Sequence, residues 1–175
     1  MSIHVQTRAE VQDWVEATNR RREQATIHGT ASDAACWCPP QLPFVKCNYD
    51  ARFDEINQQV TGGWIIRDHT GESLAWGANK LGSSRSPLEA ETKALMGAIQ
   101  QVWIRGFTLV LFEGDCAILI NNINGKTTNV AIRSICMDIA CWATKFKESR
   151  FDFVRRTCNR SAHVLAKYGC TSLLG

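Results

Sequence analysis

Glu91 occupies a position in its helix where a charged side chain is unusual. The helix start is marked by Ser86, which is suited to cap it, by Pro87 at the first helical position and by Glu89, which is placed to close a capping box. In this register Glu91 falls within an apolar stripe at the spacing of buried helical residues. The stripe consists of Leu88, Leu95, Ala98, Ile99 and Val102. A buried carboxylate needs a cationic partner, a metal ion or water, and an ion pair at the edge of the stripe is the simpler alternative.

Two aspartates follow segments that are typical of β-strands. Asp115 comes shortly after the apolar run 109–112, which predicts a strand buried on both faces. Asp115 therefore lies at the carboxyl end of that strand, where open α/β sheets bind ligands, although an aspartate there also serves as an N-cap of the next helix. Asp50 lies on the polar face of a second predicted strand, 44–53, where a lone acidic residue is usually solvated.

The order of the predicted elements is that of a mixed α/β sheet. Three β-rich segments joined by turns predict an antiparallel meander, and alternating helices and strands follow it. One substantial helix is expected between the last two strands, and Asn159 is expected to open a final helix that stops at Gly169. In chain order, the predicted elements are strands 44–53, 62–67 and 73–78, a helix from 86, a strand 109–112, helices 116–123 and 130–147, a strand 151–154 and a helix 159–169.

Five segments in this order resemble a type 1 ribonuclease H domain. They are KCNYDARF, GGWIIRDHTG, SPLEAETKAL, LFEGDCAILI and FVRRTCNRSAHVLAKYG. More narrowly, the chain resembles the plant reverse-transcriptase-like ribonuclease H domains derived from non-LTR retrotransposons. The resemblance implies a ribonuclease H-like mixed five-stranded sheet, with three antiparallel strands and then two parallel ones, flanked by helices. We assign residues 1–37 to an N-terminal helical extension and linker, and residues 38–175 to the ribonuclease H-like domain.

The resemblance also implies roles for the three carboxylates. It places Asp50, Glu91 and Asp115 on the family's ligands for two divalent ions, for which Mg²⁺ and Mn²⁺ are the suitable metals. One ion helps to generate an attacking hydroxide, and the other stabilises the leaving 3′ oxygen of the RNA. The expected function is a divalent-metal-dependent endonuclease that hydrolyses the RNA strand of RNA/DNA hybrids.

His163 stands where the family has an aspartate as its fourth ligand. Imidazole also binds metals, but it suits Mn²⁺ better than Mg²⁺ and removes one negative charge, so weaker Mg²⁺ binding is expected. The alternative is a histidine that caps or packs the last helix. The segment 155–159 also lacks the histidine-bearing loop of the cellular enzymes, and helix 130–147 lacks their basic protrusion. A catalytically impaired domain that binds nucleic acid or protein is therefore the second candidate function.

Composition agrees with one compact domain, and the charge permits contact with nucleic acid. A net charge of +3 permits phosphate binding without arguing for it, and an apolar fraction of 45% in 175 residues suffices for one core. Arg155, Arg156 and Arg160 lie near the predicted site and are candidates for nucleic-acid contacts, although such clusters are more often solvated surface.

A capping box at Thr7 predicts a helix in the extension.

The eight cysteines lack the spacing of zinc ligands, so no structural zinc is expected. No segment has the length of a signal-peptide core or of a transmembrane span. We therefore expect reduced thiols in a nuclear or cytoplasmic protein that does not enter the membrane, with targeting to an organelle left open. A monomer is the expected oligomeric state.

Overall fold

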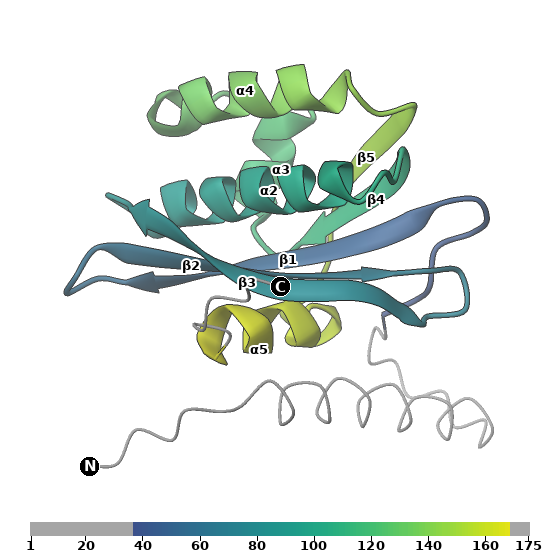
Figure 1. Cartoon of the computed structure of the whole chain (residues 1–175). Coiled ribbons are helices and arrows are strands. Elements are labelled where there is room, and N and C mark those ends of the chain that lie inside the picture. Colours follow the sequence, from purple (N-terminus) through teal and green to yellow (C-terminus); the bar gives the residue numbers. More distant parts are fainter. Residues whose placement is uncertain (1–36, 169–175) are drawn as a thin grey trace, which may run out of the picture.

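The structure is a computed structural model that describes residues 37–168, and the helix predicted at Thr7 and the helix stop at Gly169 lie outside these residues. One five-stranded sheet organises the described chain (Figure 1). No helix in this part of the chain combines the length and apolarity needed to span a bilayer. The elements in chain order are β1 (Val45–Asp54), β2 (Gln59–Arg67), β3 (Ser73–Ser83), α2 (Pro87–Ile104), β4 (Leu109–Gly114), α3 (Ala117–Ile123), the 3-10 turn η1 (Val130–Ile132), α4 (Arg133–Ala143), β5 (Glu148–Phe153), the 3-10 turn η2 (Arg156–Cys158) and α5 (Arg160–Tyr168).

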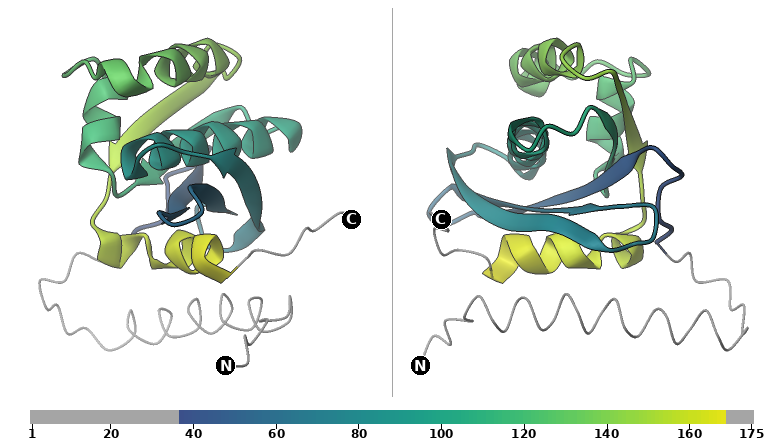
Figure 2. Two further views of the ribbon diagram at one scale, coloured as in Figure 1. Left: turned by 90° about the vertical axis from the view of Figure 1, so that its left-hand side faces the viewer. Right: turned by 45° about the vertical axis from the view of Figure 1, so that its right-hand side comes forward.

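The strand order across the sheet is β3-β2-β1-β4-β5. The strands β1, β2 and β3 pair in antiparallel fashion, whereas β4 pairs parallel to both β1 and β5. Helices α2, α3 and α4 lie on one side of the sheet, and α5 lies on the other (Figures 1 and 2). The mixed sheet predicted from the sequence is therefore confirmed, including its change from antiparallel to parallel pairing.

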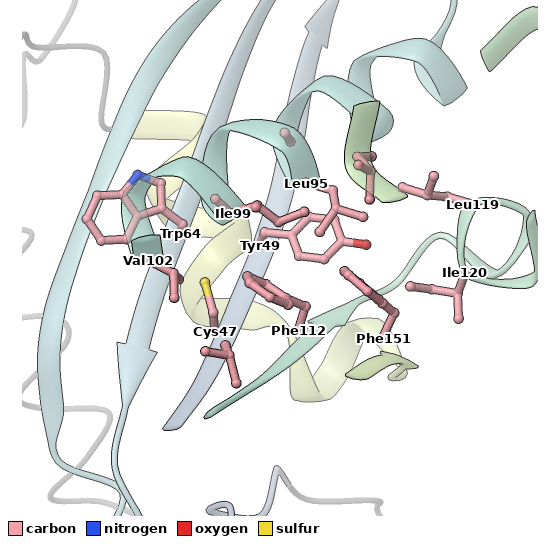
Figure 3. Close-up of a cluster of buried hydrophobic side chains, with 14 of the residues drawn as sticks. Cys47, Tyr49, Trp64, Leu95, Ile99, Val102, Phe112, Leu119, Ile120 and Phe151 are labelled. Atoms are coloured by element: carbon pink, nitrogen blue, oxygen red, sulfur yellow. The ribbon is translucent and has the colours of Figure 1, made fainter. Parts of the chain in front are cut away.

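The main core fills the space between α2 and the sheet (Figure 3). Helix α2 begins as predicted, because Ser86 Oγ accepts a hydrogen bond of 3.2 Å from the backbone N–H of Glu89. The Glu89 carboxylate differs from a standard capping box, since it accepts the N–H of Arg85 and pairs with Lys93. Most of the predicted stripe is fully buried, and only Leu88 is half-buried. The buried members are Leu95, Ala98, Ile99 and Val102.

The helix predicted over 130–147 is shorter in the structure. It begins with the 3-10 turn η1 and continues as α4, which ends at Ala143. Phe146 explains the early end, because its ring packs edge-on against Phe112 and Trp103 with centroid separations of 5.8 and 5.6 Å. Burial of this ring in the core turns the chain toward the sheet, and the N–H of Glu148 bonds Thr108 O as β5 begins.

Helix α5 lies directly against the backbone of β2 because Gly63 has no side chain. A Cβ atom at Gly63 would lie 2.2 Å from Ala166 N and 2.6 Å from Ala162 O, which no packing of a larger residue allows. Gly63 also pairs with Asp50 of β1 in the antiparallel ladder. The close approach of α5 therefore covers the sheet next to Asp50 and brings the helix side chains into reach of that residue.

Candidate metal centre

The structure brings together the three carboxylates that the sequence analysis singled out. Asp50 lies on β1, Glu91 on α2, and Asp115 directly after the end of β4. One carboxylate oxygen from each residue lies within 4.8 Å of the other two. Three elements that are distant in the sequence thus place acidic groups around one point.

Local structure explains the position of Asp115. The parallel ladder between β1 and β4 ends at the pair Asn48 and Glu113, so Asp50 and Asp115 each follow the last rung by two residues. The N-cap position of α3 belongs to Cys116, and no side chain caps this helix. Helix capping, which was the alternative explanation for Asp115, is therefore excluded.

Glu91 is a half-buried carboxylate that forms no ion pair in the described chain. Its Oε2 atom is buried and has no hydrogen-bond partner, and Glu91 forms no ion pair within residues 37–168. Burial, together with the nearby Asp50 and Asp115, raises the pKa of Glu91 to about 9. The alternative of an ion pair at the edge of the helix stripe therefore finds no partner in the described chain.

Asp50 is also buried, with only 2% of its surface exposed. The polar face of β1 is thus not solvated, because α5 packs over it. Burial and the neighbouring Asp115 raise the pKa of Asp50, and a hydrogen bond with His163 opposes this shift. The two aspartates and Glu91 therefore form a crowded acidic group in which each additional negative charge is costly.

The donor set of this group fits a divalent cation. Carboxylate oxygens are the ligands that Mg²⁺ and Mn²⁺ prefer, and a cation would neutralise the repulsion among three acidic side chains. The buried Oε2 of Glu91 has no hydrogen-bond partner and is therefore an unused acceptor in this group. Asp50, Glu91 and Asp115 are therefore the residues that would hold a metal here.

His163 contacts this site through Asp50 and is not one of the three grouped ligands. Its Nδ1 lies 2.7 Å from Asp50 Oδ2, and 37% of its side chain is exposed. An ionised carboxylate only accepts, so Nδ1–H is the donor and Nε2 is the ring nitrogen left for other partners. Arg156 Nη2 lies 3.0 Å from Nδ1 and 3.4 Å from Nε2. Arg156 therefore lies beside both ring nitrogens of His163.

Asn159 has a role that the sequence analysis missed. Helix α5 begins directly after it, as predicted, but its side-chain oxygen has no hydrogen-bond partner and does not cap the helix. Its buried amide nitrogen instead donates a 2.8 Å hydrogen bond to the backbone oxygen of Tyr49, the residue before Asp50. This bond fixes the beginning of α5 against β1 and so positions His163. The sequence signal, an asparagine before a helix, indicates a cap and says nothing about this contact across the fold.

The three arginines predicted to contact nucleic acid surround the start of α5. Arg156 lies against His163, as described above, and Arg155 and Arg160 flank it along the chain. All three are exposed. They are thus available to a phosphate at the edge of the acidic site, on the side formed by η2 and α5.

Comparisons with known proteins identify relatives of this fold. The model of the family described as "Reverse transcriptase-like" matches residues 48–169, a range that includes all four predicted ligands. No curated protein sequence matches the chain.

Solved ribonuclease H structures have the same fold. RNase H1 from the archaeon Halobacterium salinarum is 22% identical, with a TM-score of 0.67 over 72% of this chain and 96% of that one. The N-terminal RNase H domain of a Mycobacterium tuberculosis protein is 16% identical, with a TM-score of 0.64 over 71% and 91%. LC11-RNase H1, isolated from compost by a metagenomic approach and solved with an RNA/DNA hybrid, is 18% identical, with a TM-score of 0.62 over 69% and 92%.

The raised pKa of Glu91 predicts how the stability of the metal-free protein depends on pH. The folded state favours the protonated carboxyl, so this contribution is complete below the unfolded pKa near 4.5 and is lost as pH rises toward about 9. Between pH 6 and 8 the free energy of unfolding of the metal-free wild type should fall by up to about 1.4 kcal/mol per pH unit relative to Glu91→Gln. Urea unfolding with a chelator present measures this difference.

The exposed Glu55 provides the matched control, since Glu55→Gln makes the same chemical change away from the site. Its pH dependence should parallel that of the wild type. Parallel curves for the wild type and Glu91→Gln would contradict the buried, unpaired state of Glu91.

Proposed function

The chain belongs to the reverse transcriptase-like family, and we propose that it is a divalent-metal-dependent endonuclease that hydrolyses the RNA strand of RNA/DNA hybrids. The observation that carries the proposal is the convergence of Asp50, Glu91 and Asp115 on one point, where the buried Oε2 of Glu91 has no partner. The ribonuclease H fold supports it, and one protein with this fold, LC11-RNase H1, has been solved in complex with an RNA/DNA hybrid.

The proposed cofactor is a pair of Mg²⁺ or Mn²⁺ ions held by Asp50, Glu91 and Asp115. Bound ions of this kind supply a hydroxide nucleophile at neutral pH and stabilise the leaving oxygen of a phosphodiester. The protein's own contribution begins with Glu91, whose carboxyl must release its proton before it can act as a ligand. His163 holds the Asp50 carboxylate in one orientation through its Nδ1–H.

The exposed arginines provide the proposed contact with the substrate. Arg156 lies beside His163 at the edge of the acidic group, and its guanidinium can bind a phosphate with two parallel hydrogen bonds. Arg155 and Arg160 extend the positive charge along the same surface. A hybrid is favoured over duplex DNA because ribonuclease H folds read 2′-hydroxyls across a wide minor groove.

The second candidate is a domain that has kept the fold and binds nucleic acid or protein without cleaving it. The specific observation in its favour is His163 at the position of the fourth acidic ligand, together with the arginine that lies against it. The narrower assignment to plant, retrotransposon-derived domains, a nuclear or cytoplasmic location and a monomeric state remain proposals from the sequence.

Cleavage by the purified chain tests the leading proposal. The wild type should cleave an RNA/DNA hybrid in the presence of Mn²⁺ and leave duplex DNA of the same sequence intact. Asp115→Asn should lower the cleavage rate at least about tenfold, because one charged ligand is lost, while hybrid binding should persist and weaken steeply with added salt. Asp138→Asn, on the exposed side of α4, is the matched control and should cleave like the wild type. Hybrid binding without cleavage in either metal would favour the second candidate.

Variants of His163 separate a metal ligand from a packing residue. His163→Asp restores a fourth carboxylate and should increase cleavage supported by Mg²⁺, whereas His163→Ala should lower cleavage in Mn²⁺ roughly tenfold, or about 1.4 kcal/mol. Initial rates in both metals, measured well below the unfolding temperature of each variant, give the comparison.

The control for this series is His69→Asp, which makes the same change in the exposed turn between β2 and β3. Thermal unfolding must accompany the rates, since an aspartate near the start of α5 also interacts favourably with the helix dipole, by about 0.3–1 kcal/mol. Unchanged rates for both His163 variants in both metals would show that this histidine is not a ligand.

A further inference from the structure

A second polar cluster is buried on the face of the sheet opposite α2. It consists of Trp37, Lys46, Asn48 and Glu113, and we call it the Glu113 cluster. These residues are between 1% and 7% exposed. Lys46 and Asn48 alternate along β1 with Cys47 and Tyr49, which belong to the main core. The cluster therefore lies on the α5 side of the β1–β4 pair, just before the strands reach the acidic site.

Both oxygens of the Glu113 carboxylate have partners on β1. Lys46 Nζ lies 2.5 Å from Oε1, and Asn48 Nδ2 donates to Oε2 at 3.0 Å. Trp37 completes the cluster, because its Nε1–H donates to Asn48 Oδ1 at 2.7 Å. Lys46 also donates to the backbone oxygen of Cys38 at 2.7 Å. The cluster is thus a connected set of hydrogen bonds that joins β1, β4 and the chain before β1.

The cluster is located at the point where β1 and β4 separate. Asn48 and Glu113 are the last pair of the parallel ladder, and their side-chain hydrogen bond reinforces that final rung. Beyond it, β1 continues in its ladder with β2 as far as Asp54, whereas β4 ends at Gly114. The separation of Asp50 and Asp115, two residues further on, is therefore not set by backbone pairing between their own strands.

In the metal-free protein, electrostatic repulsion tends to move Asp50 and Asp115 apart. Asp50 and Asp115 are neighbouring acidic groups that repel each other when both are ionised. A connection between β1 and β4 just before the site resists the resulting displacement. Stability alone explains the cluster poorly, because apolar side chains of similar volume in place of a buried ion pair are often neutral or stabilising.

The same cluster also reaches α5. Arg67 of β2 lies over the ring of Trp37, with 4.5 Å between its Cζ atom and the ring centroid, and its Nη2 donates to Ser161 Oγ on α5. Helix α5 carries His163, so three of the elements that hold site residues, β1, β4 and α5, contact one buried assembly. Trp37 and Lys46 precede residues 48–169, the range matched by the family model, so part of this assembly lies upstream of that range.

We propose that the Glu113 cluster is a positioning device that holds Asp50 and Asp115 at the spacing a divalent ion requires. The inference rests on the proposed function, since it assigns the cluster a role toward the metal ligands. It predicts that metal affinity depends on the cluster even where the stability of the fold does not. A cluster that only stabilises the fold would affect the unfolding temperature and leave metal affinity unchanged.

Mn²⁺ titration of the full chain by calorimetry tests this role. Glu113→Gln keeps the size of the side chain and removes its charge, and it should weaken Mn²⁺ binding on the order of tenfold, the usual effect of disturbing groups that orient metal ligands. The triple variant Lys46→Met, Asn48→Leu, Glu113→Met replaces the polar contacts with apolar ones. It should still fold without metal, although the buried Trp37 N–H loses its acceptor, and it should bind Mn²⁺ about tenfold more weakly.

Two controls match these changes. Glu148→Gln removes the acidic partner of an exposed ion pair with Arg150, and Ile139→Val shortens a fully buried side chain of α4. Both should bind Mn²⁺ like the wild type.

If Glu113→Gln does not fold, the Mn²⁺ affinity of the triple variant tests the proposal. If the triple variant does not fold, the Mn²⁺ affinity of Glu113→Gln tests it. Wild-type Mn²⁺ affinity in the folded variants would overturn the proposal, as would failure of both to fold, because the cluster would then serve the fold itself. A wild type that binds no Mn²⁺ would instead reject the proposed function.

Discussion

Mutual repulsion among three closely grouped carboxylates, one buried and two half-buried, is the constraint on which the rest of this structure depends. Asp50, Glu91 and Asp115 have oxygens within 4.8 Å of one another. Burial alone would make each charge costly, and proximity adds to the cost. A fold that keeps such a group together must hold its members from outside, because the carboxylates repel one another when they are ionised.

The surrounding elements supply this support from three directions. The cap at Ser86 fixes the register of α2 and so the direction of Glu91. The close packing of α5 on Gly63 and the tether from Asn159 to Tyr49 O bring His163 against Asp50. The apolar side chains between α2 and the sheet make the structure behind the acidic group rigid (Figure 3). Asp50 and Glu91 therefore lie on regular elements, and Asp115 lies in the short bend between β4 and α3, an arrangement that favours a precise ligand geometry.

Much of this arrangement was predictable from the sequence where the signal is local. The Ser86 cap and the helix stripe placed Glu91 on the core side of α2, and the apolar run before Asp115 placed that residue at the end of a strand. The resemblance to ribonuclease H domains predicted the mixed sheet and the three carboxylates that the structure groups, whereas His163, its fourth predicted ligand, lies against Asp50. These features depend on residues that are close in the sequence or on motifs that recur in a fixed order.

The features that escaped prediction depend on contacts between distant segments. Burial of Asp50 requires α5 to pack over β1, and only the missing side chain of Gly63 permits that approach. The early end of α4 follows from the packing of Phe146 in the core, which overrides the local helix pattern. Nor did the alternation along β1 reveal that its polar face is buried, since Glu113, far along the chain, supplies the partner for Lys46.

Anomalous diffraction from crystals grown with Mn²⁺ would test the central claim most directly, that the three carboxylates form one divalent cation site. The account predicts an anomalous peak within coordinating distance of Asp50, Glu91 and Asp115 together, and none there in crystals of Asp50→Asn grown in the same way. A peak that excludes Glu91, or an acidic group left without metal at saturating Mn²⁺, would contradict it.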